Sequence, residues 1–150
     1  MKKLLVLFFV LPLIMTSCKN EETPDVSFKI EIAGGKNIND TIYVVKGDTL
    51  TIKDIYVKSN DGRKVAMGAV SYSWDGLPLR TVQFPPYKIS IITENMVLSK
   101  HLLEFNCPLY VDQSPILTAY FRYPVKLVSN ADSIPTIPEQ PIYNGITIKE

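Results

Sequence analysis

Two cysteines and one histidine are the side chains of this 150-residue chain best suited to nucleophilic or metal chemistry. A catalytic thiol needs a neighbouring base, and a metal site needs several ligands at defined spacings. No second histidine accompanies His101, and the sequence holds no H-x-H, H-E-x-x-H or C-x-x-C pattern. Cys107 ends the stretch LLEFNC and precedes Pro108. We therefore predict that Cys107 is a small core residue and that His101 is structural, at the start of a strand at the sheet's edge.

Acidic and glycine-rich motifs give no stronger sign of catalysis. Asp61, Asp75 and Asp112 lie at expected turns, but none has the D-x-D-x-D spacing of a calcium loop. The sequence also lacks a G-x-S-x-G motif and a glycine-rich phosphate loop. We predict that the chain is not an enzyme, that it holds no metal or cofactor, and that these aspartates form turns.

The first eighteen residues have the build of an export signal. Lys2 and Lys3 precede the apolar run 4–15, which is too short to span a bilayer, and small residues then lead to Cys18. The sequence MTSC at 15–18 resembles the lipobox of bacterial lipoproteins. The resemblance implies that residues 1–17 are cleaved and that Cys18 carries acyl chains that anchor the protein in a membrane.

Residues 18–25 are then a lipidated cysteine followed by a short polar tether. Within them, the sequence KNEE at 19–22 resembles the acidic export signal of Bacteroidota lipoproteins. That resemblance implies an outer-membrane protein exposed at the cell surface. A protein facing the periplasm is the alternative, with KNEE acting only as a spacer.

Cleavage before Cys18 leaves 133 residues with 14 basic and 15 acidic side chains, a formal charge of −1. This near-neutral balance argues against binding to nucleic acid through phosphate contacts. With Cys18 acylated, no disulfide can form within the chain, so the fold must depend on its core. The length suits one domain.

Apolar residues at alternate positions between residues 26 and 128 are typical of half-buried strands. Val70, Tyr72 and Trp74 share one face of a strand. Near Asp54 the apolar residues change from even-numbered to odd-numbered positions, which predicts a bulge or a strand that changes sheets. Seven or eight short strands separated by turn signals predict an all-β fold, an immunoglobulin-like antiparallel β-sandwich. We place Trp74 in its core rather than on its surface as a platform for a sugar.

The last segment, residues 129–150, contains Pro135, Pro138 and Pro141, a spacing that favours extended structure over helix.

Several stretches of residues 46–128 resemble one family. GDTLTI, VSYSWDGLPL and PPYKISIITENMVLSKHLLEF are similar in order and character to the immunoglobulin-like domains of Bacteroidota lipoproteins. This resemblance implies the fold rather than an activity, because the shared motifs are structural and the family has no assigned function.

Three short motifs and two tyrosines are candidate sites of modification or binding. Thr41, Thr49 and Ser133 each follow an aspartate and precede an aliphatic residue, which resembles the O-glycosylation site of exported Bacteroidota proteins. The alternative is that each motif simply ends a turn and begins a strand. Tyr110 and Tyr120 are candidate ligand contacts, since tyrosine packs on sugars or proteins while its hydroxyl stays in water.

Two functions remain open at this point. The first is a non-catalytic binding or adhesion module of the outer membrane that recognises a glycan or a surface protein. The second is a structural accessory subunit of an envelope or nutrient-uptake complex, docked through a sheet edge or the proline-rich end.

Overall fold

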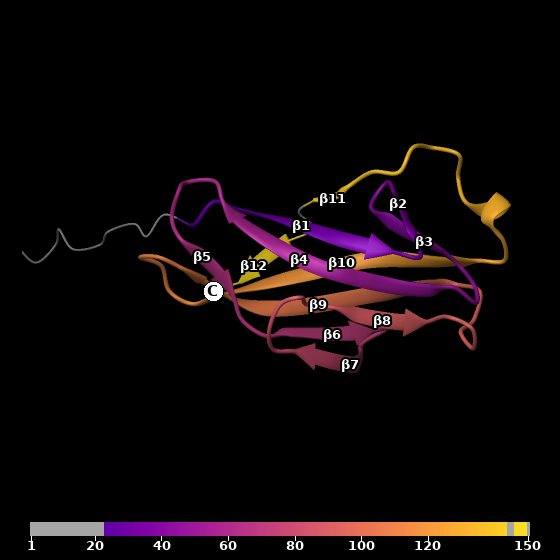
Figure 1. Ribbon diagram of the computed structural model, residues 1–150, viewed down its shortest axis with the longest axis horizontal. Coiled ribbons are helices and arrows are strands. Elements are labelled where there is room, and N and C mark those ends of the chain that lie inside the picture. Colours follow the sequence, from indigo (N-terminus) through magenta and orange to yellow (C-terminus); the bar gives the residue numbers. More distant parts are fainter. Residues whose placement is uncertain (1–22, 144–145, 150) are drawn as a thin grey trace, which may run out of the picture.

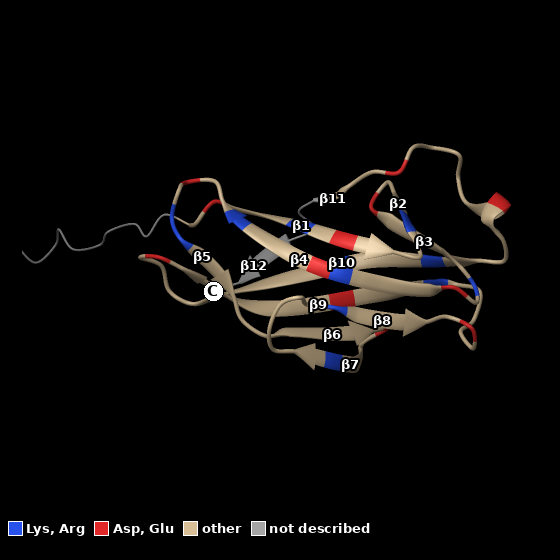
Figure 2. Ribbon diagram, in the orientation of Figure 1, with Lys and Arg blue, Asp and Glu red and all other residues tan. Residues whose placement is uncertain are grey.

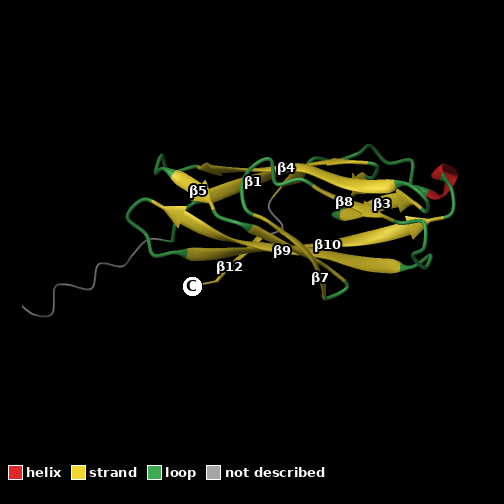
Figure 3. Cartoon of the chain, turned by 60° about the horizontal axis from the view of Figure 1, so that its bottom comes forward, coloured by secondary structure: helices red, strands yellow, loops and turns green. Residues whose placement is uncertain are grey.

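Two β-sheets packed face to face form the part of the chain that the computed structural model describes, residues 23–143 and 146–149 (Figure 1). The smaller sheet consists, in order, of β11 (Ile142–Tyr143), β1 (Val26–Ala33), β4 (Thr49–Ser59) and β8 (Ile89–Ile92). The larger sheet consists, in order, of β2 (Lys36–Ile38), β3 (Thr41–Val45), β10 (Leu117–Val128), β9 (Lys100–Val111), β6 (Val70–Trp74) and β7 (Leu77–Val82). In addition, β5 (Val65–Met67) pairs with β9, and β12 (Ile146–Lys149) pairs with β10. Figure 3 shows the two layers.

The predicted all-β sandwich is confirmed, although its strands differ from the expected seven or eight short antiparallel ones. The described residues contain twelve strands, and β9 and β10 are each 12 residues long. One pair, β3 with β10, is parallel. The additional strands β2 and β5 have three residues each, too few for a two-residue alternation to be recognised in the sequence.

The chain changes sheets at Gly34 and Gly35, between β1 in one layer and β2 in the other. Gly34 has a φ of +74°, and a Cβ there would lie 2.0 Å from the carbonyl oxygen of Thr49. A Cβ on Gly35 would lie 3.0 Å from the side chain of Ile42. Only glycine fits at position 34, and the turn between the two sheets is confined to the two glycines.

Aromatic rings from both sheets form the centre of the core. Phe105 on β9 stacks on Phe121 of β10 with ring centroids 4.5 Å apart, and Phe121 meets Phe28 of β1 edge to face at 5.0 Å. Cys107 and Trp74 are buried in the same cluster, as predicted. Burial raises the pKa of the Cys107 thiol to about 11, so little of the nucleophilic thiolate exists at neutral pH.

The parity switch in β4 is a β-bulge. Glu31 of β1 pairs with Asp54, but the next residue, Ile32, pairs with Ile52, which leaves Lys53 as the extra residue. Asp54 Oδ1 accepts hydrogen bonds from the backbone N–H groups of Ile55 and Tyr87, at 2.8 and 3.0 Å. The strand therefore stays in one sheet, and the bulge ties it to the connection that leads into β8.

The C-terminal segment returns along the sandwich and adds a strand to each sheet. A short 3₁₀ helix (Ala131–Ser133) follows β10. Asn37 and Gln140 then exchange two hydrogen bonds, Gln140 N–H to the Asn37 carbonyl and Asn37 Nδ2 to the Gln140 carbonyl. Beyond this contact β11 extends the smaller sheet and β12 the larger one, so the sheets continue past residue 128.

Candidate binding surface

His101 lies at the start of β9 and is held by groups that are distant in sequence. Its Nδ1 is 2.7 Å from Asp75 Oδ2, and the ring stacks on Trp74 with centroids 5.2 Å apart. Asp75 Oδ1 also accepts the backbone N–H of Leu102 at 2.7 Å. The structural role predicted for His101 agrees with these contacts, but β9 has neighbours on both sides, so the histidine is at a strand end and not at a sheet edge.

Ser99 gives this site an outward likeness to a Ser–His–Asp triad, because its Oγ is 3.1 Å from His101 Nε2. The same Nε2 is 3.0 Å from the carbonyl oxygen of Val97, a contact that needs a hydrogen on the nitrogen. A ring that donates from both nitrogens cannot accept the proton of a serine. The geometry therefore suits a structural contact in which His101 joins the loop 94–99, through Val97, to the β6–β7 turn, through Asp75. We call this contact the clasp.

The clasp shifts two pKa values in opposite directions. Burial lowers the pKa of His101, but the hydrogen bonds to Asp75 and to the Val97 carbonyl and the charge of Asp75 outweigh it, so the pKa lies above its ordinary 6.5. For Asp75, burial raises the pKa, but the hydrogen bonds from His101 and Leu102 and the charge of His101 bring it below 3.8. The charged pair is therefore the favoured state between these two ordinary values.

We expect the stability that this pair supplies to be greatest near pH 5 and to fall as the pH rises. A raised histidine pKa stabilises the fold fully below the unfolded value and is lost above the folded one, while the aspartate contribution is lost only in acid. Because Asp75 is 43% exposed, the advantage over Asp75→Asn should be only about 1 kcal/mol. Urea unfolding of both proteins at several pH values measures it. Asp112→Asn, in another turn, is the control, and an equal loss for Asp75→Asn at pH 5 and pH 9 would contradict the charged clasp.

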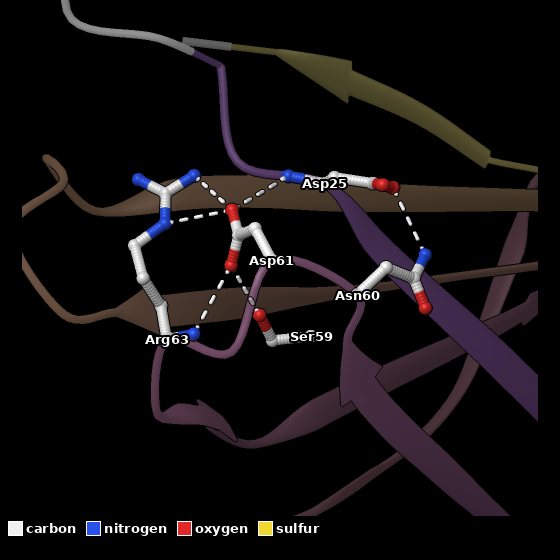
Figure 4. A network of polar contacts seen from close by, with 5 residues as sticks. All are labelled: Asp25, Ser59, Asn60, Asp61 and Arg63. Carbon is white, nitrogen blue, oxygen red and sulfur yellow. Dashed lines mark hydrogen bonds and ion pairs between the residues drawn. The ribbon is translucent and has the colours of Figure 1, made fainter.

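A second polar network fixes the start of the sandwich (Figure 4). Arg63 Nε donates to Asp61 Oδ2 at 2.8 Å, and Asn60 Nδ2 donates to Asp25 Oδ1 at 2.9 Å. Hydrogen bonds from Arg63 and Ser59 hold the pKa of the Asp61 carboxyl well below 3.8. The network joins the chain just before β1 to the turn after β4, and it thus fixes where the predicted tether meets the domain.

The three aspartates considered for chemistry all lie in turns, as predicted: Asp61, Asp75 and Asp112. Within the described ranges, no group of three or more His, Cys, Asp or Glu side chains is arranged to hold a metal ion.

Tyr110 and Tyr120 both lie on the outer face of the larger sheet and are exposed. Tyr120 pairs with Asn106, and Tyr110 is four residues further along β9, about 13 Å at the rise of a strand. The ring of Tyr110 packs beside Gly68 and borders a shallow hollow of about 260 Å³ with Lys64 and Ile116. The two tyrosines are therefore separate features and do not form one aromatic platform.

The candidate glycosylation residues occupy different settings. Thr49 is exposed at the first position of β4, whereas Thr41 is only half-exposed at the start of β3. Ser133 is exposed in the 3₁₀ helix, and its hydroxyl donates to Asn130 Oδ1 at 2.9 Å. Both readings of these motifs, a glycan acceptor and a turn followed by a strand, remain predictions. Cys18 and the sequence KNEE lie outside the described residues.

Exposed apolar side chains gather along one side of the sandwich, where β7 and β8 end their sheets. Those of β7, β8 and the loops beside them are Leu77, Leu79, Phe84, Ile92, Val97 and Leu98. Between the two strands lies a hollow of about 690 Å³, which we call the edge groove. It is lined by Leu79, Arg80, residues 88–92 and Met96.

The edge groove exists because the smaller sheet is narrower than the larger one on this side. Leu77 pairs with the buried Trp74, and Arg80 pairs with the buried Tyr72, so both should share the inward direction of their partners. Yet every residue of β7 except Val82 is exposed, and Leu77 is 71% exposed. No strand of the smaller sheet covers β7 among the described residues, since that sheet ends at β8.

The charge in the edge groove is of one sign. Arg80 and Lys88 contribute to its lining, which has no acidic side chain. Figure 2 shows a blue band on β7, whose one basic residue is Arg80, while blue and red bands are interspersed along the rest of the ribbon. Neither cation forms a salt bridge with any carboxylate of the described chain.

Sequence reasoning did not identify this surface. Leu77 and Leu79 follow a turn and alternate with Pro78 and Arg80, which gives no sign that the strand is left uncovered. The signal that was available is the crowding of apolar residues in IITENMVL at 91–98, where strict alternation fails.

Comparison with known protein families and with curated proteins found no match. Across the described residues, none of the helical structure is both long enough and apolar enough to cross a membrane.

Proposed function

We propose that this chain is a non-catalytic binding module of the bacterial outer membrane, held through acylated Cys18, whose partner is a protein. The edge groove carries this proposal. Soluble proteins rarely leave a group of large apolar side chains open to water unless the group is an interaction site. Here Leu79 and Ile92, which line the groove, are 43% and 65% exposed, and Leu77, also on β7, is 71% exposed.

A protein fits the edge groove better than a glycan does. Leu79, Ile92 and Met96 line it, and a partner that covers such an apolar surface gains stability by excluding water. Sugar recognition relies on aromatic faces and dense hydrogen bonding, and the exposed Tyr110 and Tyr120 lie on another face and apart from each other. The surface-protein form of the binding hypothesis is therefore the one we adopt.

The location is supported by the sequence MTSC at 15–18 and by KNEE at 19–22, which resemble the lipoprotein cleavage site and export signal described above. The polar network around Asp61 lies at the opposite end of β4 from the β8 pairing, since Ser59 pairs with Val26 and Thr49 with Ile92. The residues just before β1, where the predicted tether would join the domain, therefore lie away from Ile92.

Ile92→Asp is expected to lower the amount of partner that co-purifies with the full-length protein at least ten-fold. The substitution places a charge on the wall of the groove but lies at an exposed edge position, so the fold should be retained. Crosslinking in cells of the native host, followed by purification in detergent and quantitative mass spectrometry, measures the yield.

Ile116→Asp is the matched control, because Ile116 is 66% exposed and Ile92 is 65% exposed. The control should retain the partner. Equal recovery with both variants, or equal loss, would contradict docking at the edge groove.

A further inference from the structure

We infer that the partner enters the edge groove as an extended segment, which pairs with β8 as a fifth strand of the smaller sheet and carries acidic residues among apolar ones. This inference rests on the proposed function, and it specifies the shape and charge of what binds.

The free edge of β8 provides the backbone for such pairing. β8 pairs with β4 on one side, from Ile89 opposite Ile52 to Ile92 opposite Thr49, and has no strand neighbour on its other side among the described residues. An edge strand presents a row of backbone N–H and C=O groups ready to pair with another chain. Strand addition of this kind supplies affinity through main-chain hydrogen bonds and specificity through pockets for alternate side chains.

The smaller sheet ends at β8, whereas the larger sheet continues to β7, and this difference in width leaves space for an added strand. A strand added to β8 would lie about 4.8 Å beyond it and would extend the smaller layer toward the uncovered β7. There its inward side chains would meet Leu79 and Arg80, which line the groove. The missing layer explains why Leu77, which pairs with the buried Trp74, remains exposed.

The positive charges that line the edge groove indicate which residues the bound segment should carry. Arg80 and Lys88 have no carboxylate partner in the described chain, and no acidic residue contributes to the groove. A glutamate or aspartate on the inward side of the segment would pair with Arg80, which lies opposite the buried Tyr72, and one on its outward side with Lys88, which lies between the buried Tyr87 and Ile89. A second copy of this chain fits poorly, because a symmetric contact would bring two arginines and two lysines to one seam.

Synthetic peptides test the inference without knowledge of the natural partner. The probe is a fluorescent nine-residue peptide in which valine alternates with glutamate, and its counterpart has lysine in place of glutamate. Fluorescence anisotropy with the detergent-solubilised full-length protein should show at least ten-fold tighter binding of the glutamate peptide. The double charge reversal Arg80→Glu with Lys88→Glu should invert this preference, with circular dichroism to verify the fold.

Backbone pairing is tested separately by N-methylating alternate amides of the glutamate peptide, in both registers. At least one methylated form should lose ten-fold or more in affinity, because the donors that face β8 are then absent. Equal binding of both charge forms, or undiminished binding of both methylated peptides, would overturn the strand-addition inference. The loss of partner in Ile92→Asp cells would still support the proposed function, so the two can fail independently. Self-association through the groove in place of peptide binding would also overturn the inference.

Discussion

Replacing Phe105 by alanine is expected to lower the free energy of unfolding by about 3–5 kcal/mol, the usual cost of removing a buried phenylalanine. Phe105 is 2% exposed and contacts three other rings: Phe121 at 4.5 Å, Tyr72 at 5.2 Å and Tyr123 at 5.8 Å between centroids. The loss combines the transfer of the ring to water with the cavity that remains between two long strands. Urea unfolding of the full-length protein, followed by the fluorescence of Trp74, measures it.

Two comparisons identify the cause of that loss. Phe105→Leu keeps most of the volume and should cost about 1–2 kcal/mol, while Ile137→Ala, at a position 49% exposed, should change stability by less than about 0.5 kcal/mol. A loss below about 1 kcal/mol for Phe105→Ala would show that the four rings do not form the packed centre of the sandwich.

Cys18→Ala is expected to move the protein from the membrane fraction to the soluble or unprocessed fraction almost completely. If Cys18 carries two or three acyl chains, they supply the stable attachment, and one chain alone would hold the protein only marginally. Fractionation of native-host cells, with the intact mass of the protein before and after delipidation, measures both the location and the modification.

The second cysteine offers the matched control. Cys107→Ala removes a thiol that is fully buried in the core, so it should reduce stability slightly and leave membrane attachment unchanged. Persistence of Cys18→Ala in washed membranes, or a wild-type mass without acyl chains, would remove the lipoprotein part of the proposal.

Local patterns in the sequence predict local structure in this chain well. The alternation of Val70, Tyr72 and Trp74 gave the correct buried face of β6, and the parity switch near Asp54 located the bulge in β4. Both features depend on neighbouring residues, so periodicity is enough to find them.

Features that depend on packing between distant segments could not be predicted from the sequence. Asp75 and His101 are 26 residues apart and meet only because β6 pairs with β9. The crossing at Gly34 and Gly35 reads as an ordinary turn, although it moves the chain from one sheet to the other. The edge groove was missed for the same reason, because the exposure of Leu77 is set by the absence of a fifth strand in the opposite sheet.

Site-specific photo-crosslinking shows whether a protein partner occupies the edge groove in the cell. A photoreactive residue is placed at position 92 of the full-length protein in living cells of its native host, and at position 116 as the equally exposed control. We expect one discrete adduct of higher mass from position 92 and none from position 116. No adduct at position 92, or the same adducts from both positions, would contradict it.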